Sequence, residues 1–143
     1  MSIGNSTTSP GLELKITSDP ASLQQVRHAL ERFCADHGFD DSECDEIGLC
    51  FNEAVANIIR HAYDGAKDKP IDVQTRVAGD GLTLVIRDWG NGELPPSRPK
   101  PKLDLLEPGG LGLICLQQMM DEVRYDPQDK GMLLTLVKRK RKP

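Results

Sequence analysis

The sequence predicts an α+β fold: a two-layer α/β sandwich with a mostly antiparallel sheet and helices on one face. Two long segments with apolar residues at helical spacing follow one another, and most strand-like segments come later, as pairs joined by turns. Helices and hairpins are therefore segregated along the chain, which is typical of α+β proteins. The 143 residues, 38% hydrophobic and 28% charged, fit one globular domain with its own core.

The N-terminal part is predicted to hold a strand and a helix. Residues 1–10 are polar and are expected to form a disordered leader. Residues 12–17 alternate between apolar and polar side chains, as a half-buried strand does. A helix is expected from Ser18-Asp19-Pro20 to Gly38, because apolar residues recur there at helical spacing, at Leu23, Val26, Leu30 and Phe33.

A second helix is predicted from residue 40 to about Tyr63. Asp40 to Glu43 supply a capping side chain and acids for the first turn, and Asp64-Gly65 stops the helix. Its apolar face consists of Ile47, Cys50, Phe51, Ala54, Val55 and Ile58.

A hairpin and a long loop are expected next. Residues 71–77 and 82–86 are strands around a Gly-rich turn at 78–81. Residues 93–108 contain five prolines and are predicted to be a loop. Loops of this length in compact domains are usually lids or binding loops.

The C-terminal part is predicted to hold a helix at 110–120 and strands at 123–125 and 132–137. The domain is then expected to span residues 11–138, with a basic tail at 139–143. A run of basic residues can meet an acidic partner or nucleic acid, but a solvated, partly disordered end is the simpler interpretation.

Composition excludes several other classes. The net charge of -4 argues against direct nucleic-acid binding, and no apolar run approaches the roughly 20 residues that span a membrane. The four cysteines form no C-x-x-C pair, and no histidine lies at zinc-ligand spacing. Reduced thiols in a cytoplasmic protein are the simplest account.

Glu53, Asn57 and His61 are spaced by four and therefore lie on one face of the second predicted helix. A carboxylate can take a proton from a nucleophile, and an amide oxygen can join phosphate oxygens around Mg²⁺. Arg60 and His61 are candidates for contacts with phosphate groups. A polar face exposed to solvent is the alternative.

Asp88 ends a strand and precedes Gly90 and Gly92. A carboxylate there can accept a hydrogen bond from an amino group such as that of adenine, and the glycines let the backbone approach a ligand. A simple turn is the alternative. A predicted apolar helix follows the glycine-rich run Gly109, Gly110, Leu111, Gly112 and Leu113. The backbone N–H groups at the start of such a helix can bind phosphate. The alternative is that the glycines only form a hinge.

Together, in this order, the three segments resemble the GHKL ATPase/kinase superfamily, and within it the small bacterial anti-sigma regulatory factor and serine/threonine-protein kinase family. The resemblance covers about residues 12–138. Residues 53–63 resemble the family's N box, residues 88–92 its D-x-G-x-G box, and residues 110–113 its G-x-G-L box. Glu93-Leu94-Pro95-Pro96 departs from many relatives, which have an apolar residue directly after the last glycine.

The resemblance implies a Bergerat fold that binds Mg-ATP and transfers the γ-phosphate to a serine or threonine of a small, STAS-like anti-sigma factor antagonist. Glu53 would be the base, Asn57 the Mg²⁺ ligand and Asp88 the adenine-binding residue. Gly90, Gly92, Gly110 and Gly112 would frame the pocket under a lid at about 93–108. A sigma factor as partner and a homodimer are also implied.

Two other functions remain open from the sequence. One is an ATP-binding, partner-switching regulator of the same fold without kinase activity, although such a binder needs no base at Glu53. The other is a domain of this fold with a different use, for example a nucleic-acid-associated role of the basic tail.

Overall fold

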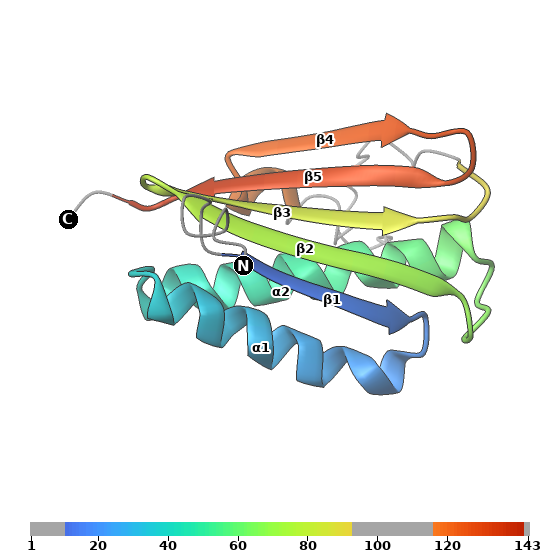
Figure 1. The fold of residues 1–143 in the computed structure, drawn as a ribbon, viewed down its shortest axis with the longest axis horizontal. Coiled ribbons are helices and arrows are strands. Elements are labelled where there is room, and N and C mark those ends of the chain that lie inside the picture. Colours follow the sequence, from blue (N-terminus) through green and yellow to red (C-terminus); the bar gives the residue numbers. More distant parts are fainter. Residues whose placement is uncertain (1–10, 93–115, 142–143) are drawn as a thin grey trace, which may run out of the picture.

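The computed structural model describes residues 11–92 and 116–141. Figure 1 shows its helices and strands in the colours of the sequence. Every strand and both long helices that the sequence predicts are present, within two residues at most ends. The strands are β1 (Gly11–Thr17), β2 (Pro70–Ala78), β3 (Gly81–Asp88), β4 (Glu122–Pro127) and β5 (Met132–Arg139), and the helices are η2 (Pro20–Ser22), α1 (Leu23–Asp36), α2 (Asp41–Asn57) and η3 (Ile58–Ala62).

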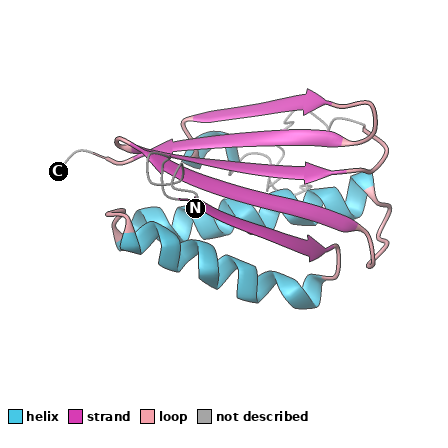
Figure 2. Cartoon of the chain, viewed as in Figure 1, coloured by secondary structure: helices cyan, strands magenta, loops and turns pink. Residues whose placement is uncertain are grey.

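The five strands form one sheet in the order β1-β2-β3-β5-β4, and every neighbouring pair is antiparallel. Helices α1 and α2 cover one face of this sheet, as Figure 2 shows in cyan and magenta. The predicted two-layer α+β sandwich is therefore confirmed. Of the helix predicted at 110–120, residues 116–119 are helical and the earlier residues lie outside the described part, as do the predicted leader and loop.

The core lies between the two layers. Alternate residues of β2 and β3 point inward, and Ile71, Leu84 and Ile86 are completely buried against α2 residues such as Phe51 and Val55. Burial also raises the pKa of Cys34 to about 12 and that of Cys44 to about 11, so both thiols stay protonated at neutral pH.

Helix α2 starts as predicted but ends in a different geometry. Asp40 and Glu43 form a capping box, in which the Asp40 carboxylate accepts from the Glu43 N–H at 2.7 Å. From Ile58 to Ala62 the helix continues as a π-type turn, η3, with hydrogen bonds to the fifth preceding residue. The Tyr63 N–H, for example, donates to the Ile58 carbonyl at 3.0 Å. Such turns often occur at functional sites.

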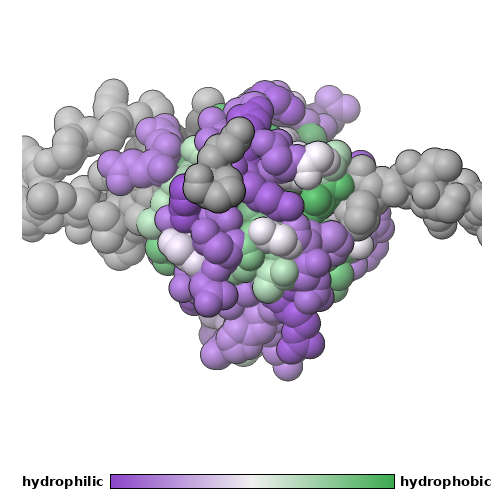
Figure 3. Space-filling model, turned by 90° about the vertical axis from the view of Figure 1, so that its left-hand side faces the viewer, coloured by the Kyte–Doolittle hydropathy of each residue, from purple (hydrophilic) through white to green (hydrophobic). Residues whose placement is uncertain are grey.

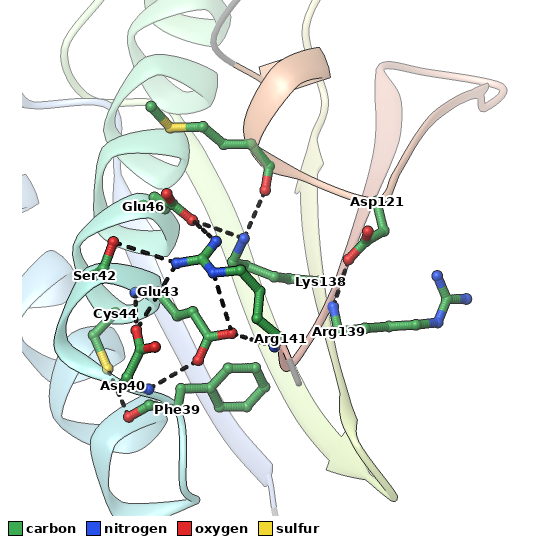
Figure 4. A network of polar contacts seen from close by, with 11 residues as sticks. Phe39, Asp40, Ser42, Glu43, Cys44, Glu46, Asp121, Lys138, Arg139 and Arg141 are labelled. Atoms are coloured by element: carbon green, nitrogen blue, oxygen red, sulfur yellow. Dashed lines mark hydrogen bonds and ion pairs between the residues drawn. The ribbon is translucent and has the colours of Figure 1, made fainter. Parts of the chain in front are cut away.

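Residues 139–141 of the expected basic tail are attached to the fold, although the side chains of Arg139 and Arg141 stay exposed. Strand β5 continues to Arg139, and the Arg141 N–H donates to the buried Glu43 carboxylate at 2.6 Å (Figure 4). The Arg141 guanidinium and the Lys138 ammonium each lie 2.9 Å from the Glu46 carboxylate. Lys138 also donates to the Met119 carbonyl, so one cluster joins α2, β5 and the end of the helix at 116–119.

This cluster lies at the end of the molecule where α1 connects to α2, which Figure 3 views directly. The surface there is mainly hydrophilic, with small apolar areas between the polar side chains. The opposite end of the sheet holds the end of β3 and the end of the second helix (Figure 1). The C-terminal residues thus stabilise one end of the sandwich and leave the other end available for a site.

The charges of the cluster predict a pH-dependent stability. Burial by itself raises the pKa of Glu46, but the hydrogen bonds and charges of Lys138 and Arg141 outweigh it and lower that pKa. The ionised carboxylate therefore stabilises the fold above its unfolded pKa of about 4.3, and this contribution disappears as the pH falls through the folded pKa.

We expect Glu46→Gln to lower the free energy of unfolding at pH 7 by about 1.5–3 kcal/mol, the usual size of a hydrogen bond to a charged group. Urea unfolding between pH 7 and about pH 3 measures this, and the difference from the unmodified chain should be constant near neutrality and shrink below about pH 4.3. Glu122→Gln is the control, because Glu122 pairs with Arg139 at an exposed site. An equal loss at every pH would contradict the assignment.

Candidate functional site

A cavity lies between the end of the second helix and one edge of the sheet, formed by the end of β3, the second half of β4 and the start of β5. One wall comes from α2 and η3, and the other comes from the sheet. The lining is mainly apolar with a few polar groups, which is the usual character of a small-molecule site. Its residues are Ala54, Asn57, Ile58, His61, Ala62, Asp88, Gly92, Tyr125, Met132 and Leu134.

Asp88 supplies the carboxylate of this cavity. It is 2% exposed, and its Oδ1 accepts from the Gly90 N–H at 2.9 Å. Burial raises the pKa of Asp88, while the N–H groups of Gly90 and Met132 and the charge of Arg87 partly offset this effect. A largely desolvated acceptor of this kind gains most from a ligand that donates a hydrogen bond to it.

The backbone after Asp88 is held against the end of the helix. The Asn91 N–H donates to the Ala62 carbonyl at 3.1 Å, and the Asn91 side-chain amide donates to the His61 carbonyl at 2.8 Å. A Cβ at Gly90 would overlap Ala62. Gly90 is therefore required for this close approach.

The turn between β4 and β5 closes the other side of Asp88. Gly131 has a φ of +86°, and a Cβ there would overlap the Asp88 carbonyl and the Trp89 backbone. The Arg87 guanidinium donates to the Asp88 carbonyl and, at 2.8 Å, to the Lys130 carbonyl of the same turn. The position of the Asp88 carboxylate is thus fixed from both neighbouring elements.

Asn57 contributes a side-chain amide to the same cavity. It is 7% exposed, and neither its Oδ1 nor its Nδ2 makes a hydrogen bond to any described residue. Buried polar groups are normally paired, so an unpaired amide that lines a cavity suits a ligand or a hydrated metal ion. This environment fits the amide oxygen that the sequence predicts as a Mg²⁺ ligand.

Glu53 is one turn from Asn57 but does not line the same cavity. Glu53 instead lines a second, more polar hollow between α1 and α2, together with Arg27 and His28. The other lining residues of this hollow are Pro20, Leu23, Gln24, Asn52 and Ala56. Glu53, the candidate base, therefore lies on a different face of the second helix from the residues that line the cavity with Asp88.

The structure brings together part of the predicted site. Asn57, His61, Asp88 and Gly92 line one cavity, and Gly90 lies directly behind it. Arg60 does not line this cavity, and its buried Nε makes no hydrogen bond to any described residue. The predicted lid at 93–108 and the run Gly109, Gly110, Leu111, Gly112 and Leu113 lie outside the described residues, so these predictions stay untested.

Sequence reasoning missed the apolar wall of the cavity. Tyr125, Met132 and Leu134 come from β4 and β5, and their inward direction follows from the alternation along those strands. Residues 132–134 are all apolar, so the sequence shows neither which of their side chains face the cavity nor the strand pairing that sets them opposite α2. Within the described residues, no helix combines the length and the apolar character needed to cross a membrane.

Comparisons with known proteins agree with this geometry. Residues 16–138 match the family described as the histidine kinase-like ATPase domain. The serine-protein kinase RsbW of Bacillus velezensis is 27% identical over 141 residues, covering 93% of this chain and 88% of that relative. The serine-protein kinase RsbW of Bacillus subtilis is 28% identical over 135 residues, covering 89% and 84%.

Solved structures show the same fold. The RsbU and RsbW domains of a Mycobacterium tuberculosis protein match with a TM-score of 0.69 and 24% identity, over 94% of this chain and 34% of that one. The histidine kinase domain of an Erythrobacter litoralis blue-light activated kinase matches with a TM-score of 0.50 and 17% identity, over 84% and 60%. This chain thus spans less than two thirds of either solved chain.

These findings confirm the expected Bergerat-type (GHKL) fold and the ATPase family that the motifs indicate. The family match includes α2, β3 and β5, which carry the cavity. The chain belongs to the histidine kinase-like ATPase domain family.

Proposed function

We propose that the chain is an ATP-dependent serine/threonine-protein kinase and anti-sigma factor. It transfers the γ-phosphate of ATP to a serine or threonine of a small, STAS-like antagonist protein, and it sequesters a sigma factor. Relatives over nearly the whole chain are named serine-protein kinases. The observation that carries the proposal is a buried carboxylate, Asp88, in one cavity with the buried amide of Asn57, which makes no hydrogen bond to a described residue.

The cavity suits an adenine base. Ile58, Met132 and Leu134 offer apolar surface to the faces of a planar ring. Asp88 can accept a hydrogen bond from the exocyclic amino group of adenine, which a 6-oxopurine does not have. His61 lines the same cavity and is a candidate for contacts with the sugar or the phosphates.

Asn57 fits a role at the phosphates. Its Oδ1, which makes no hydrogen bond within the described part of the chain, could serve as a ligand of a Mg²⁺ ion held mainly by phosphate oxygens and water. Bound there, Mg²⁺ would neutralise charge that develops on the β- and γ-phosphates during transfer. Arg60, three residues after Asn57, carries a further positive charge, and its Nε makes no hydrogen bond to residues 11–92 or 116–141.

Glu53 fits the role of base because it lies one turn from Asn57 and lines a separate pocket, outside the cavity that would hold adenine. The hollow that it lines is open and polar, so a side chain of another protein can enter it. In the transfer, the hydroxyl oxygen of the substrate forms a bond to the γ-phosphorus while the bond to the β–γ bridging oxygen breaks. The hydroxyl proton passes to Glu53, and ADP leaves.

The alternative is a regulator of the same fold that binds ATP without transferring phosphate. The carboxylate of Glu53, one turn from Asn57, favours the kinase, since binding alone requires no base. Incubation with γ-labelled ATP, Mg²⁺ and the small antagonist protein separates the two functions. Label on a serine or threonine of the antagonist supports the kinase, and binding of ATP and of the antagonist without transfer of label supports the regulator. We also propose a homodimer, by resemblance to the family.

Glu53→Gln tests the base directly. The amide has the same shape but cannot take a proton, so we expect phosphate transfer to fall roughly 100-fold or more, as for loss of a general base. The Kd for ATP should change less than about twofold, because Glu53 does not line the cavity. The measurements are label transfer and calorimetric titration with ATP.

Asp45→Asn is the matched control for Glu53→Gln, since it removes an exposed carboxylate from the same helix. It should change neither transfer nor affinity. Transfer by the Glu53→Gln variant at a rate comparable to that of the unmodified chain would show that Glu53 is not the base.

Asp88→Asn tests adenine recognition. We expect weaker ATP binding, because the asparagine amide can present a donor to the adenine amino group. In the unmodified chain, ATP affinity should also fall as the pH is lowered through the raised pKa of Asp88, since the protonated acid accepts less well. Titrations from pH 8 to pH 5 measure this.

The Asp88→Asn variant should lose the part of the pH dependence that comes from this carboxylate. Protonation of ATP itself affects both proteins equally and cancels in the comparison. Identical affinities and identical pH profiles would refute adenine binding by Asp88.

A further inference from the structure

Tyr63 connects three parts of the structure through one buried hydroxyl group. It follows η3 directly and is 8% exposed. Its Oη donates to the Pro70 carbonyl at 2.6 Å and accepts from the Trp89 N–H at 2.8 Å. A phenol has one donor hydrogen, and here that hydrogen and an oxygen lone pair are both engaged. The hydroxyl therefore joins the end of the helix to the start of β2 and to the residue after Asp88.

The protonation state of this phenol keeps the bridge intact. Burial raises the pKa of Tyr63, and the Trp89 N–H only partly offsets this effect. The hydroxyl thus retains its proton at neutral pH and can keep donating to Pro70. The Tyr63 hydroxyl therefore does not change its protonation state near neutral pH, and its hydrogen bonds hold the backbone of Pro70 and Trp89 in a fixed position.

The geometry that it holds is that of the turn after Asp88. Tyr63 fixes the Trp89 N–H, and His61 and Ala62 fix Asn91 through their carbonyls. The Gly90 N–H, between these two anchors, donates to the Asp88 carboxylate. Residues 61–63 therefore form a seat for residues 89–91, and that turn in turn orients the carboxylate.

The π-type turn explains why Tyr63 can serve this purpose. Hydrogen bonds to the fifth preceding residue, from Tyr63 to Ile58, widen the last turn of the helix. The side chains that follow are rotated relative to those of a continuing α-helix, and Tyr63 then points toward the end of β3. A small displacement of a recognition group is costly, since a shift of about 1 Å can remove a productive contact.

We propose that Tyr63 is a positioning residue for nucleotide selection: its hydroxyl holds the turn at residues 89–91 so that the Asp88 carboxylate faces the 6-amino group of the base. This inference rests on the proposed function, in which Asp88 binds adenine. It assigns to Tyr63 no contact with the nucleotide, because Tyr63 does not line the cavity.

Tyr63→Phe removes only the hydroxyl and tests this role. The readout is the ratio of the affinities for ATP and ITP, which differ in the 6-amino group that Asp88 would recognise. We expect the Kd for ATP to rise about tenfold, as for the loss of one hydrogen bond of about 1.4 kcal/mol, while the Kd for ITP stays nearly constant. Trp89 is the single tryptophan of the chain, and its emission should shift as the turn moves.

Ser18→Ala is the matched control. Ser18 is fully buried, and its hydroxyl donates to the Ala66 carbonyl and accepts from the Lys69 N–H at 3.1 Å. It therefore bridges backbone groups of the same loop without reaching Asp88. We expect Ser18→Ala to lower the melting temperature as Tyr63→Phe does, yet to keep the ATP/ITP ratio and the Trp89 emission of the unmodified chain.

The outcomes separate the inference from the proposed function. If the unmodified chain does not prefer ATP over ITP, adenine recognition by Asp88 is wrong. If it prefers ATP and Tyr63→Phe keeps the full preference, the role of Tyr63 is wrong. Should Tyr63→Phe not fold, Gly90→Ala displaces the same turn from Ala62. Loss of the preference for ATP in Gly90→Ala supports the proposal that the position of residues 89–91 sets this preference. An unchanged preference overturns that proposal, and the role of Tyr63 with it.

Discussion

The contact between the end of the second helix and the turn after β3 is the constraint on which the candidate site depends. Three hydrogen bonds, from Trp89 and Asn91 to residues 61–63, hold segments that are nearly thirty residues apart in the sequence. The absence of a side chain at Gly90 lets the two backbones meet, and Gly131 closes the turn from the far side. Because of this contact, Asp88 remains buried, and a donor in the cavity would add to the hydrogen bonds that its carboxylate accepts from the Gly90 and Met132 N–H groups. The same contact places Asn57 opposite Asp88.

The two ends of the sandwich show different arrangements of polar groups. At the end with the α1–α2 connection, the polar groups are paired: Glu43 and Glu46 meet Lys138 and Arg141, and the last described residues become part of the fold. At the other end, the amide of Asn57 and the Nε of Arg60 make no hydrogen bond to a described residue. Paired charges are typical of a structural role, whereas unpaired buried groups beside a cavity are typical of ligand binding.

Much of this could be predicted from the sequence because the relevant signals are local. Alternation located the strands, the capping residues located the start of α2, and the spacing of Glu53 and Asn57 placed them on one helix. The remaining features depend on contacts that no local pattern encodes. The π-type turn lies where η3 meets the turn after β3, and Arg141 bonds to Glu43 and Glu46, which are almost one hundred residues away in the sequence. The separation of Glu53 from the cavity likewise depends on how α1 packs beside α2.

The most direct test of the account is a crystal structure of the chain with Mg²⁺ and a non-hydrolysable ATP analogue. The account predicts the adenine amino group within about 2.7–3.2 Å of the Asp88 carboxylate, the distance of an ordinary hydrogen bond. It also predicts the Asn57 Oδ1 on the metal at about 2.0–2.1 Å, as is usual for Mg²⁺. A nucleotide bound elsewhere, or a base in this cavity whose amino group points away from Asp88, would contradict it.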